Sequence, residues 1–143
     1  MKKITAKELT NEEKARLVIG KNTWHNEDLE GKVPVFMMSD GPVGVRHPRD
    51  VNSATSDTAP SIAYPCFEVL SQTWNLELAN KFGDSIGTMA DQMDTAGWYG
   101  PAMNIHRTAF AGRNFEYYSE DGVLSGDIAA SAIQGAQAHG VYA

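Results

Sequence analysis

The chain has 143 residues, 42% of them hydrophobic, and its formal net charge is −6. This length suits one domain, the apolar fraction excludes a disordered chain, and the scattered basic residues form no stripe that could meet the phosphates of a nucleic acid. We expect no membrane span and no signal peptide, because no apolar run approaches the roughly 20 residues that cross a bilayer, and a single cysteine suits a reducing, cytoplasmic location.

The first predicted element is a short helix over residues 11–19. Thr10 and Glu13 have the T-x-x-E spacing of a capping box, and Gly20 supplies a stop. The continuous apolar run VPVFMMS, residues 33–39, is typical of a strand that is buried on both faces, as in a parallel sheet.

Turn-forming residues follow this strand in DGPVGVR, residues 40–46, and the polar stretch 47–61 predicts a long loop. Residues 62–66 are a candidate for a second short strand. Asn75 is a suitable N-cap for a helix that runs to about Thr95 and is stopped by Gly97. One face of this helix is apolar, at Leu78, Phe82, Ile86, Met89 and Met93.

The last third of the chain repeats this order. Residues 98–105 predict a buried strand, 106–121 a loop, and 124–140 a helix, and 141–143 resemble the start of another strand. Strands that alternate with helices indicate an α/β fold with a parallel sheet. Ligands bind at the carboxyl ends of such strands, so the loops 40–46 and 106–121 should converge there.

Two side chains in these loops are candidate ligands for a polar substrate. The carboxylate of Asp40 can accept strong hydrogen bonds from two hydroxyl groups, or it can cap the amides of its own turn. The guanidinium fork of Arg113 suits a carboxylate, a phosphate or paired hydroxyls, or it can anchor its loop through an ion pair with a neighbouring acid. The pattern alone leaves both alternatives open.

Three acids near Arg113 raise the question of a glycosidase, which needs two carboxyl groups that face each other across the bond. Glu116 and Glu120 are four residues apart, but Ser119, Glu120 and Asp121 precede a helix, and this position favours a capping role. We assign no metal and no cofactor, since no phosphate-binding fingerprint is present and none of the four histidines has metal-ligand spacing: His25, His47, His106 and His139.

At this point the chain resembles the N-terminal part of a glycoside hydrolase of family 3, of the β-glucosidase type. The resemblance runs nearly end to end, and the last two of its five segments, in this order, are highly specific: LTNEEKARLVIGKNTWH, FMMSDGPVGVR, YPCFEVLSQTWNLELANKFGDSIG, GPAMNIHR and FAGRNFEYYSEDGVLSG. The connection at TAGWYG is shorter than is usual in the family, which puts the register of the second strand in question.

The resemblance implies a retaining exo-glycosidase of carbohydrate metabolism, with a TIM-type (β/α)₈ barrel followed by an α/β sandwich domain. It implies that Asp40 and Arg113 bind hydroxyls of the terminal sugar. It assigns no catalytic residue to this chain, because in the family the nucleophile and the acid/base lie further on. Glu116 then holds the loop, and three aromatic residues pack it against the barrel wall: Phe115, Tyr117 and Tyr118.

Residues 1–143 are therefore interpreted as a partial barrel, the first two to three βα units of a β-glucosidase-like hydrolase, which is inactive alone. Its expected partners are a β-glucoside or oligosaccharide, the remainder of the barrel and the sandwich domain. Two alternatives stay open: a non-catalytic sugar-binding module, and one half of a split enzyme. The sugar, the linkage and the oligomeric state do not follow from the sequence.

Overall fold

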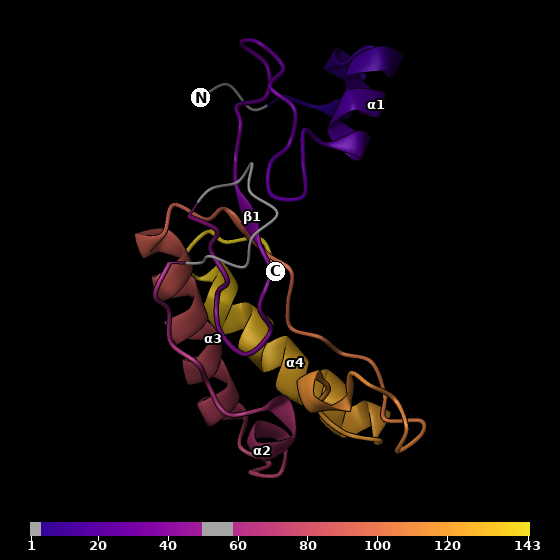
Figure 1. The fold of residues 1–143 in the computed structure, drawn as a ribbon, viewed down its shortest axis with the longest axis vertical. Coiled ribbons are helices and arrows are strands. Elements are labelled where there is room, and N and C mark those ends of the chain that lie inside the picture. The colour runs from indigo at the N-terminus through magenta and orange to yellow at the C-terminus, as the bar shows by residue number, and fades with distance from the viewer. Residues whose placement is uncertain (1–3, 50–58) are drawn as a thin grey trace. The chain divides into compact units, whose positions relative to one another are not determined.

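The computed structural model describes residues 4–49 and 59–143 (Figure 1). The chain divides into two compact units, Met1–Met38 and Ser39–Ala143, and each is described by itself. Most of the predicted loop 47–61 lies outside the described residues. In the part of the chain that is described, no helix is both long and apolar enough to cross a membrane.

The first unit begins with a short 3₁₀ turn, Ala6–Glu8, and then the helix α1, Asn11–Ile19. The predicted capping box of α1 is confirmed. The Thr10 hydroxyl accepts from the Glu13 amide at 3.2 Å, and the Glu13 carboxylate accepts from the Thr10 amide at 2.7 Å. Gly20 ends the helix with a φ of 73°, a value that favours glycine.

The predicted strand over residues 33–39 is wrong for most of its length, since the strand β1 covers only Met38–Ser39. Val33 and Met37 form isolated antiparallel bridges with Leu29 and His25, and between these bridges the side chain of Asn26 bonds the backbone. Its amide donates to the Pro34 carbonyl at 2.9 Å and its oxygen accepts from the Phe36 amide at 2.7 Å. Val35 is 44% exposed, so the segment is not buried on both faces.

The second unit has the predicted alternation of strand and helix. The strand β2, Gly97–Trp98, is the neighbour of β1, and the Tyr99 amide donates to the Ser39 carbonyl at 2.8 Å. Near the C-terminus, Tyr142 forms a parallel bridge with Gly97, which supports the prediction that 141–143 start a strand. The chain therefore has an α/β fold. Its helices are α2, Phe67–Ser71; α3, Leu76–Gln92; and α4, Gly122–Gln137.

The N-cap of α3 is the predicted residue, and that of α4 is one of the three residues, 119–121, with a predicted capping role. The Asn75 side chain accepts from the Leu78 amide at 3.0 Å, and the Asp121 side chain accepts from the Leu124 amide at 2.8 Å. The end of α3 differs from the prediction. The helix stops at Gln92, and the chain turns away at Asp94, which has a φ of 52°. Gly97 lies in β2 and is not the helix stop.

Two further expectations are corrected. Residues 62–66 form no strand, and Ile62 is 57% exposed. The predicted strand 98–105 is reduced to β2, because Pro101 has no amide to donate to a sheet, and Met103 and Ile105 after it are exposed. The short helix α2, which the sequence analysis did not anticipate, lies between these regions.

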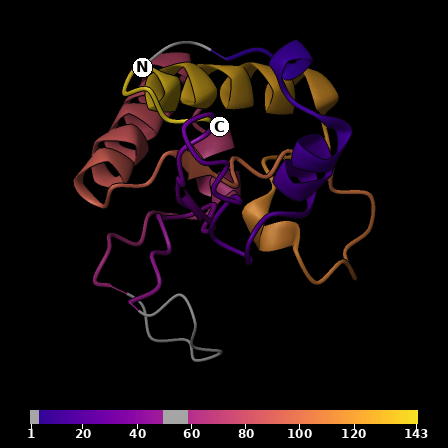
Figure 2. The same ribbon diagram turned by 90° about the horizontal axis from the view of Figure 1, so that it is seen from above.

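Helices α3 and α4 pack against each other with almost no space between their backbones (Figures 1 and 2). A methyl group added at Gly83 would lie 1.9 Å from the Ala132 carbonyl oxygen, and one at Gly135 would lie 2.2 Å from the Asn80 carbonyl oxygen. Real side-chain carbons do not approach an oxygen this closely. Each helix therefore needs a glycine where it meets the backbone of the other.

Aromatic rings fill the core between the helices and the loop 106–121. The rings of Phe67 and Tyr118 are stacked, with centroids 4.5 Å apart, and Phe82 meets Phe67 edge-on at 5.5 Å. Tyr118 is buried, and its hydroxyl has no hydrogen-bond partner among the described residues. Burial raises the pKa of this phenol above its ordinary value.

We expect the Tyr118→Phe variant to be more stable than the wild-type chain, by up to about 1 kcal/mol, because it removes an unpaired buried hydroxyl. This difference in stability should grow above pH 10. There the Tyr118 phenol ionises in the unfolded state but not in the folded state, because its pKa is raised on folding, so the wild-type chain loses stability and the Phe variant does not. Urea titrations at pH 7 and pH 10.5 would measure it. Tyr64→Phe is the control, because it breaks a bond to the Ser85 hydroxyl and should cost about 1 kcal/mol. An equal loss in Tyr118→Phe would contradict the prediction.

Candidate functional site

The segment 40–46 forms a closed turn at the end of β1. The Arg46 amide donates to the Asp40 carbonyl at 2.8 Å, and these two residues form an antiparallel bridge. The Trp98 indole donates to the Gly41 carbonyl at 2.9 Å, which ties the turn to β2. Gly41 and Gly44 have φ values of 104° and 146°, and a side chain on either would collide with a carbonyl oxygen. The two glycines of DGPVG are therefore required by the shape of the turn.

Asp40 is exposed, and one of its carboxylate oxygens accepts from the Gly41 amide at 2.8 Å. The capping alternative is thus realised, but only for one oxygen. The second oxygen has no hydrogen-bond partner among the described residues and remains free to accept. The bridge also places Arg46 opposite Asp40, because residues paired across an antiparallel bridge are side-chain neighbours. Arg46 was not among the site residues predicted from the sequence.

The loop that carries Arg113 is held by side chains that bond to its own backbone. The His106 ring donates through Nε2 to the Asn114 carbonyl at 2.9 Å, and the side-chain amide of Asn114 donates through Nδ2 to the Thr108 carbonyl at 2.9 Å. The His106 amide also donates to the Ser119 carbonyl at 3.1 Å. These bonds close the loop around a short 3₁₀ turn, Asn114–Glu116, that begins directly after Arg113.

Arg113 pairs with Glu116 through its Nε atom, so the loop-anchoring alternative of the sequence analysis is also realised. The Glu116 side chain is 5% exposed, whereas the Arg113 side chain is 72% exposed. The predicted role of Glu116 in holding the loop is confirmed. Because the buried acid takes only Nε, the two terminal nitrogens of the guanidinium have no partner among the described residues.

The two predicted site residues also act on each other. The pKa of the Arg113 guanidinium lies above its ordinary value, chiefly because of the hydrogen bond and charge of Glu116. The negative charge of Asp40 is a smaller cause of the same shift. Asp40 and Arg113 therefore lie within range of a Coulombic interaction, without an ion pair between them. Each residue keeps a free polar group, an acceptor oxygen on Asp40 and a donor fork on Arg113.

Some of the residues after Glu116 have structural roles, and others do not. Asp121 caps α4, and the Ser119 hydroxyl accepts from the Asp121 amide at 3.0 Å. Glu120 is exposed and makes no hydrogen bond or ion pair with the described residues, so its predicted capping role is wrong. The aromatic residues also divide: Tyr118 is buried, but Phe115 is 55% exposed, against the expected packing. Tyr117 lies 6.1 Å from the His106 ring.

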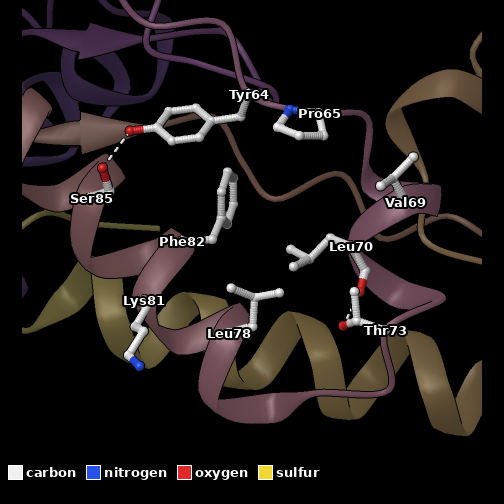
Figure 3. A pocket seen from close by; sticks show the side chains of 9 residues that line it. All are labelled: Tyr64, Pro65, Val69, Leu70, Thr73, Leu78, Lys81, Phe82 and Ser85. Carbon is white, nitrogen blue, oxygen red and sulfur yellow. Dashed lines mark hydrogen bonds between the residues drawn. The ribbon is translucent and has the colours of Figure 1, made fainter.

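No group of three metal-ligating side chains converges within residues 4–49 and 59–143. A separate pocket of about 290 Å³ lies between α2 and α3 (Figure 3). Figure 3 shows Leu70, Leu78 and Phe82 pointing into it, with Tyr64 bonded to Ser85 at one side. Its lining contains no carboxylate, and neither Asp40 nor Arg113 belongs to it. This pocket therefore has no group that could carry out glycoside chemistry.

No family model matches the chain, but individual proteins do. It is 40% identical over 140 residues to thermostable β-glucosidase B of Acetivibrio thermocellus, which covers 96% of this chain and 18% of the relative. It is 38% identical over 141 residues to an exo-α-(1→6)-L-arabinopyranosidase of Bifidobacterium longum, over 96% of this chain and 19% of the relative.

Solved structures agree with these sequences. β-Glucosidase 3B of Thermotoga neapolitana, in complex with α-D-glucose, superposes with a TM-score of 0.80 at 36% identity over 94% of this chain and 21% of its own. A GH3 β-glucosidase of Bifidobacterium adolescentis gives a TM-score of 0.75 at 36% identity, over 92% and 18%.

Nearly the whole chain is thus related to glycosidases. The resemblance to glycoside hydrolase family 3, of the β-glucosidase type, is confirmed by these sequences and structures. The chain spans about a fifth of the length of the relatives that it matches. It corresponds to a part of each of these glycosidases.

Proposed function

We propose that this chain supplies part of the sugar-binding subsite of a β-glucosidase-like hydrolase of family 3. Within that proposal, residues 1–143 are the first two to three βα units of an N-terminal TIM-type barrel. The order β1, α3, β2, α4, followed by the parallel bridge of Tyr142 to Gly97, supports this assignment. The observation that carries the proposal is the match of about 95% of the chain to β-glucosidases and related glycosidases.

Asp40 and Arg113 are the proposed sugar ligands. The free oxygen of Asp40 accepts from a sugar hydroxyl, and the two terminal nitrogens of Arg113 donate to neighbouring hydroxyl oxygens. Hydrogen bonds with an ionised partner are shorter and stronger than neutral ones, and a planar fork also selects the orientation of its ligand. The buried Glu116 carboxylate fixes the direction of that fork by holding Nε.

The acids of this chain are poorly suited to break a glycosidic bond. A retaining glycosidase needs two carboxyl groups about 5 Å apart, one as nucleophile and one as acid/base. Glu116 is buried in its ion pair, and Asp121 caps α4. We therefore propose that both catalytic groups come from the remainder of the barrel and from a second α/β sandwich domain. The substrate is a β-glucoside or oligosaccharide, and the setting is cytoplasmic carbohydrate metabolism.

The isolated chain is expected to have no glycosidase activity, because the resemblance to family 3 assigns neither the nucleophile nor the acid/base to it. Release of p-nitrophenol from p-nitrophenyl β-D-glucoside by the purified 143-residue chain should equal that of buffer. Enzyme-specific turnover that is abolished by boiling would contradict the expectation. Binding of glucose without turnover, together with no gain of activity from a complementing partner, would favour a non-catalytic sugar-binding module.

A chimeric enzyme tests the proposed function directly. The matched segment of A. thermocellus β-glucosidase B is replaced by this chain, since the two are 40% identical over 140 residues. We expect the chimera to hydrolyse p-nitrophenyl β-D-glucoside or the corresponding α-L-arabinopyranoside. A folded chimera that hydrolyses neither would argue against the proposal. Supplying the remainder of the relative as a separate polypeptide tests the split-enzyme alternative.

A further inference from the structure

A buried hydroxyl group joins the two residues that flank the Asp40–Arg46 bridge. Ser39 precedes Asp40, and His47 follows Arg46. The Ser39 hydroxyl lies 3.2 Å from the Thr95 hydroxyl, and the His47 Nδ1 atom lies 3.3 Å from the same Thr95 oxygen. The turn is thus closed twice at its base, by the backbone bridge of Asp40 and Arg46 and by the side chain of Thr95.

Thr95 is itself held firmly in place. It lies between α3 and β2, is 4% exposed, and donates its amide to the Ala90 carbonyl at 2.8 Å. Ser39, fully buried, is fixed from the other side by the bond from the Tyr99 amide to its carbonyl. The hydroxyl of Thr95 therefore connects the end of α3 to both ends of the turn that carries Asp40.

A hydroxyl is the group of this size that is suited to the connection. One hydroxyl group can accept a hydrogen bond from one neighbour and donate to the other, and serine or threonine both offer it. Valine has nearly the same shape but offers neither, and would leave the buried Ser39 hydroxyl and the half-buried His47 ring nitrogen without this partner. Hydrogen bonds in a buried network are strong when complete, and their loss is costly.

We propose that Thr95 is a positioning residue, which holds the Asp40–Arg46 turn in the geometry that binds the sugar. This inference rests on the proposed function, because it assigns Thr95 a role at the same site. Thr95 does not touch the sugar; it acts through Ser39 and His47 on the carboxylate next to them. Loosening this contact should weaken sugar binding without unfolding the chain.

The test compares the full 143-residue chain with its Thr95→Val and Thr95→Ser variants. Two quantities are measured by NMR under conditions in which the amide spectrum is well dispersed, as expected of folded protein: the affinity for D-glucose, and the exchange rate of the Arg46 amide, which is bonded to Asp40. The Ser125 amide, bonded to the Asp121 carbonyl in α4, is the internal reference for global stability. Thr88→Val is the matched control, because this exposed hydroxyl bonds only within α3.

We expect Thr95→Val to speed exchange at Arg46 relative to Ser125 by about tenfold and to weaken glucose binding by about fivefold or more. Thr95→Ser and Thr88→Val should match the wild type in both. If Thr95→Val fails to fold, Ser39→Ala and His47→Ala each remove one of the two bonds and should each loosen Arg46.

Two results would overturn the inference. If Thr95→Val leaves Arg46 exchange and glucose affinity unchanged, the Thr95 hydroxyl does not hold the Asp40–Arg46 turn. The proposed function would then still stand. Thr95→Val and Thr95→Ser that lower Arg46 and Ser125 protection equally would show a role in stability alone. If the wild-type chain binds no glucose, the proposed function loses support, and the role of Thr95 at a sugar site fails with it. Slow Arg46 exchange in Thr95→Ser but not in Thr95→Val would still show that the hydroxyl holds the turn.

Discussion

Gly83→Ala is expected to be among the most destabilising single changes in this chain. The added methyl group would lie 1.9 Å from the Ala132 carbonyl oxygen and 3.0 Å from the Ala132 Cα atom. These are backbone atoms of a helix, which cannot rotate aside like the end of a side chain, so α3 and α4 must move apart. Overpacking of a core typically costs about 1–3 kcal/mol, and we expect a loss at or above the upper end of this range in urea unfolding.

Gly126→Ala provides a control with the opposite sign. Gly126 lies within α4 on its exposed side, and a methyl group there would meet nothing within 4 Å. Alanine is favoured over glycine in a helix, so this variant should gain about 0.5–1 kcal/mol. Glycine to alanine at these two positions therefore distinguishes the effect of helix propensity, at Gly126, from the effect of helix packing, at Gly83. Equal effects of the two variants, in size and sign, would show that the close approach of α3 and α4 does not exist in solution.

Asp40→Ala and Arg113→Ala should each lower kcat/KM of the chimeric enzyme by more than about tenfold, because each removes a charge-assisted hydrogen bond to the sugar. Glycosidases use contacts to sugar hydroxyls that strengthen in the transition state, so part of the loss should appear in kcat. Steady-state kinetics with p-nitrophenyl β-D-glucoside would measure both constants. Thermal unfolding should change little for Asp40→Ala, since its side chain is exposed.

Glu120→Ala is the matched control for these two variants. It also removes a charge from the loop region, but Glu120 is exposed and bonds to none of the described residues. Its kinetic constants and its unfolding temperature should both equal those of the unmodified chimera. Equal kinetic defects in all three variants would instead point to the net charge of the region, and would refute specific roles for Asp40 and Arg113.

The starts of α1 and α3 could be predicted to the residue, and that of α4 to within three residues, because their signals are local; α2 shows no such signal. The caps at Thr10, Asn75 and Asp121 each bond to an amide three residues further on, and the sequence displays both partners together. The end of α3 was less clear. Gly97 suggested the stop, but Asp94 adopts the left-handed conformation that ends the helix, which short polar residues tolerate.

The strands were predicted too long because pairing depends on distant partners. VPVFMMS has the composition of a buried strand, yet the Asn26 side chain, eight to ten residues earlier, bonds its backbone instead. Composition reports the tendency of a segment to be extended, not the presence of a neighbour to pair with. The strand predicted over residues 98–105 is also too long, because Pro101 interrupts the hydrogen-bond ladder after β2.

In the candidate site, too, local contacts could be predicted and contacts between distant residues could not. The ion pair of Arg113 and Glu116 spans three residues, and the sequence analysis anticipated it as one alternative. The contacts that hold the neighbours of Asp40, Ser39 and Gly41, were missed, since they come from Thr95 and Trp98 across the unit. No local pattern marks such contacts. Arg46 could have been found, because a tight turn over DGPVGVR returns the chain beside its first residue.

The anchoring of the Asp40 turn also has a consequence for how preparations of this protein are judged. The bond from Thr95 to Ser39 joins residues 56 apart, and that from Trp98 to Gly41 joins residues 57 apart. Closing such long loops costs chain entropy that local helix caps do not, so the turn is complete only in molecules whose α3 has already docked. A collapsed intermediate can keep its capped helices and lack the turn. Helical content in the far-ultraviolet therefore overstates the competent fraction, and titration with a sugar ligand is the better assay of native molecules.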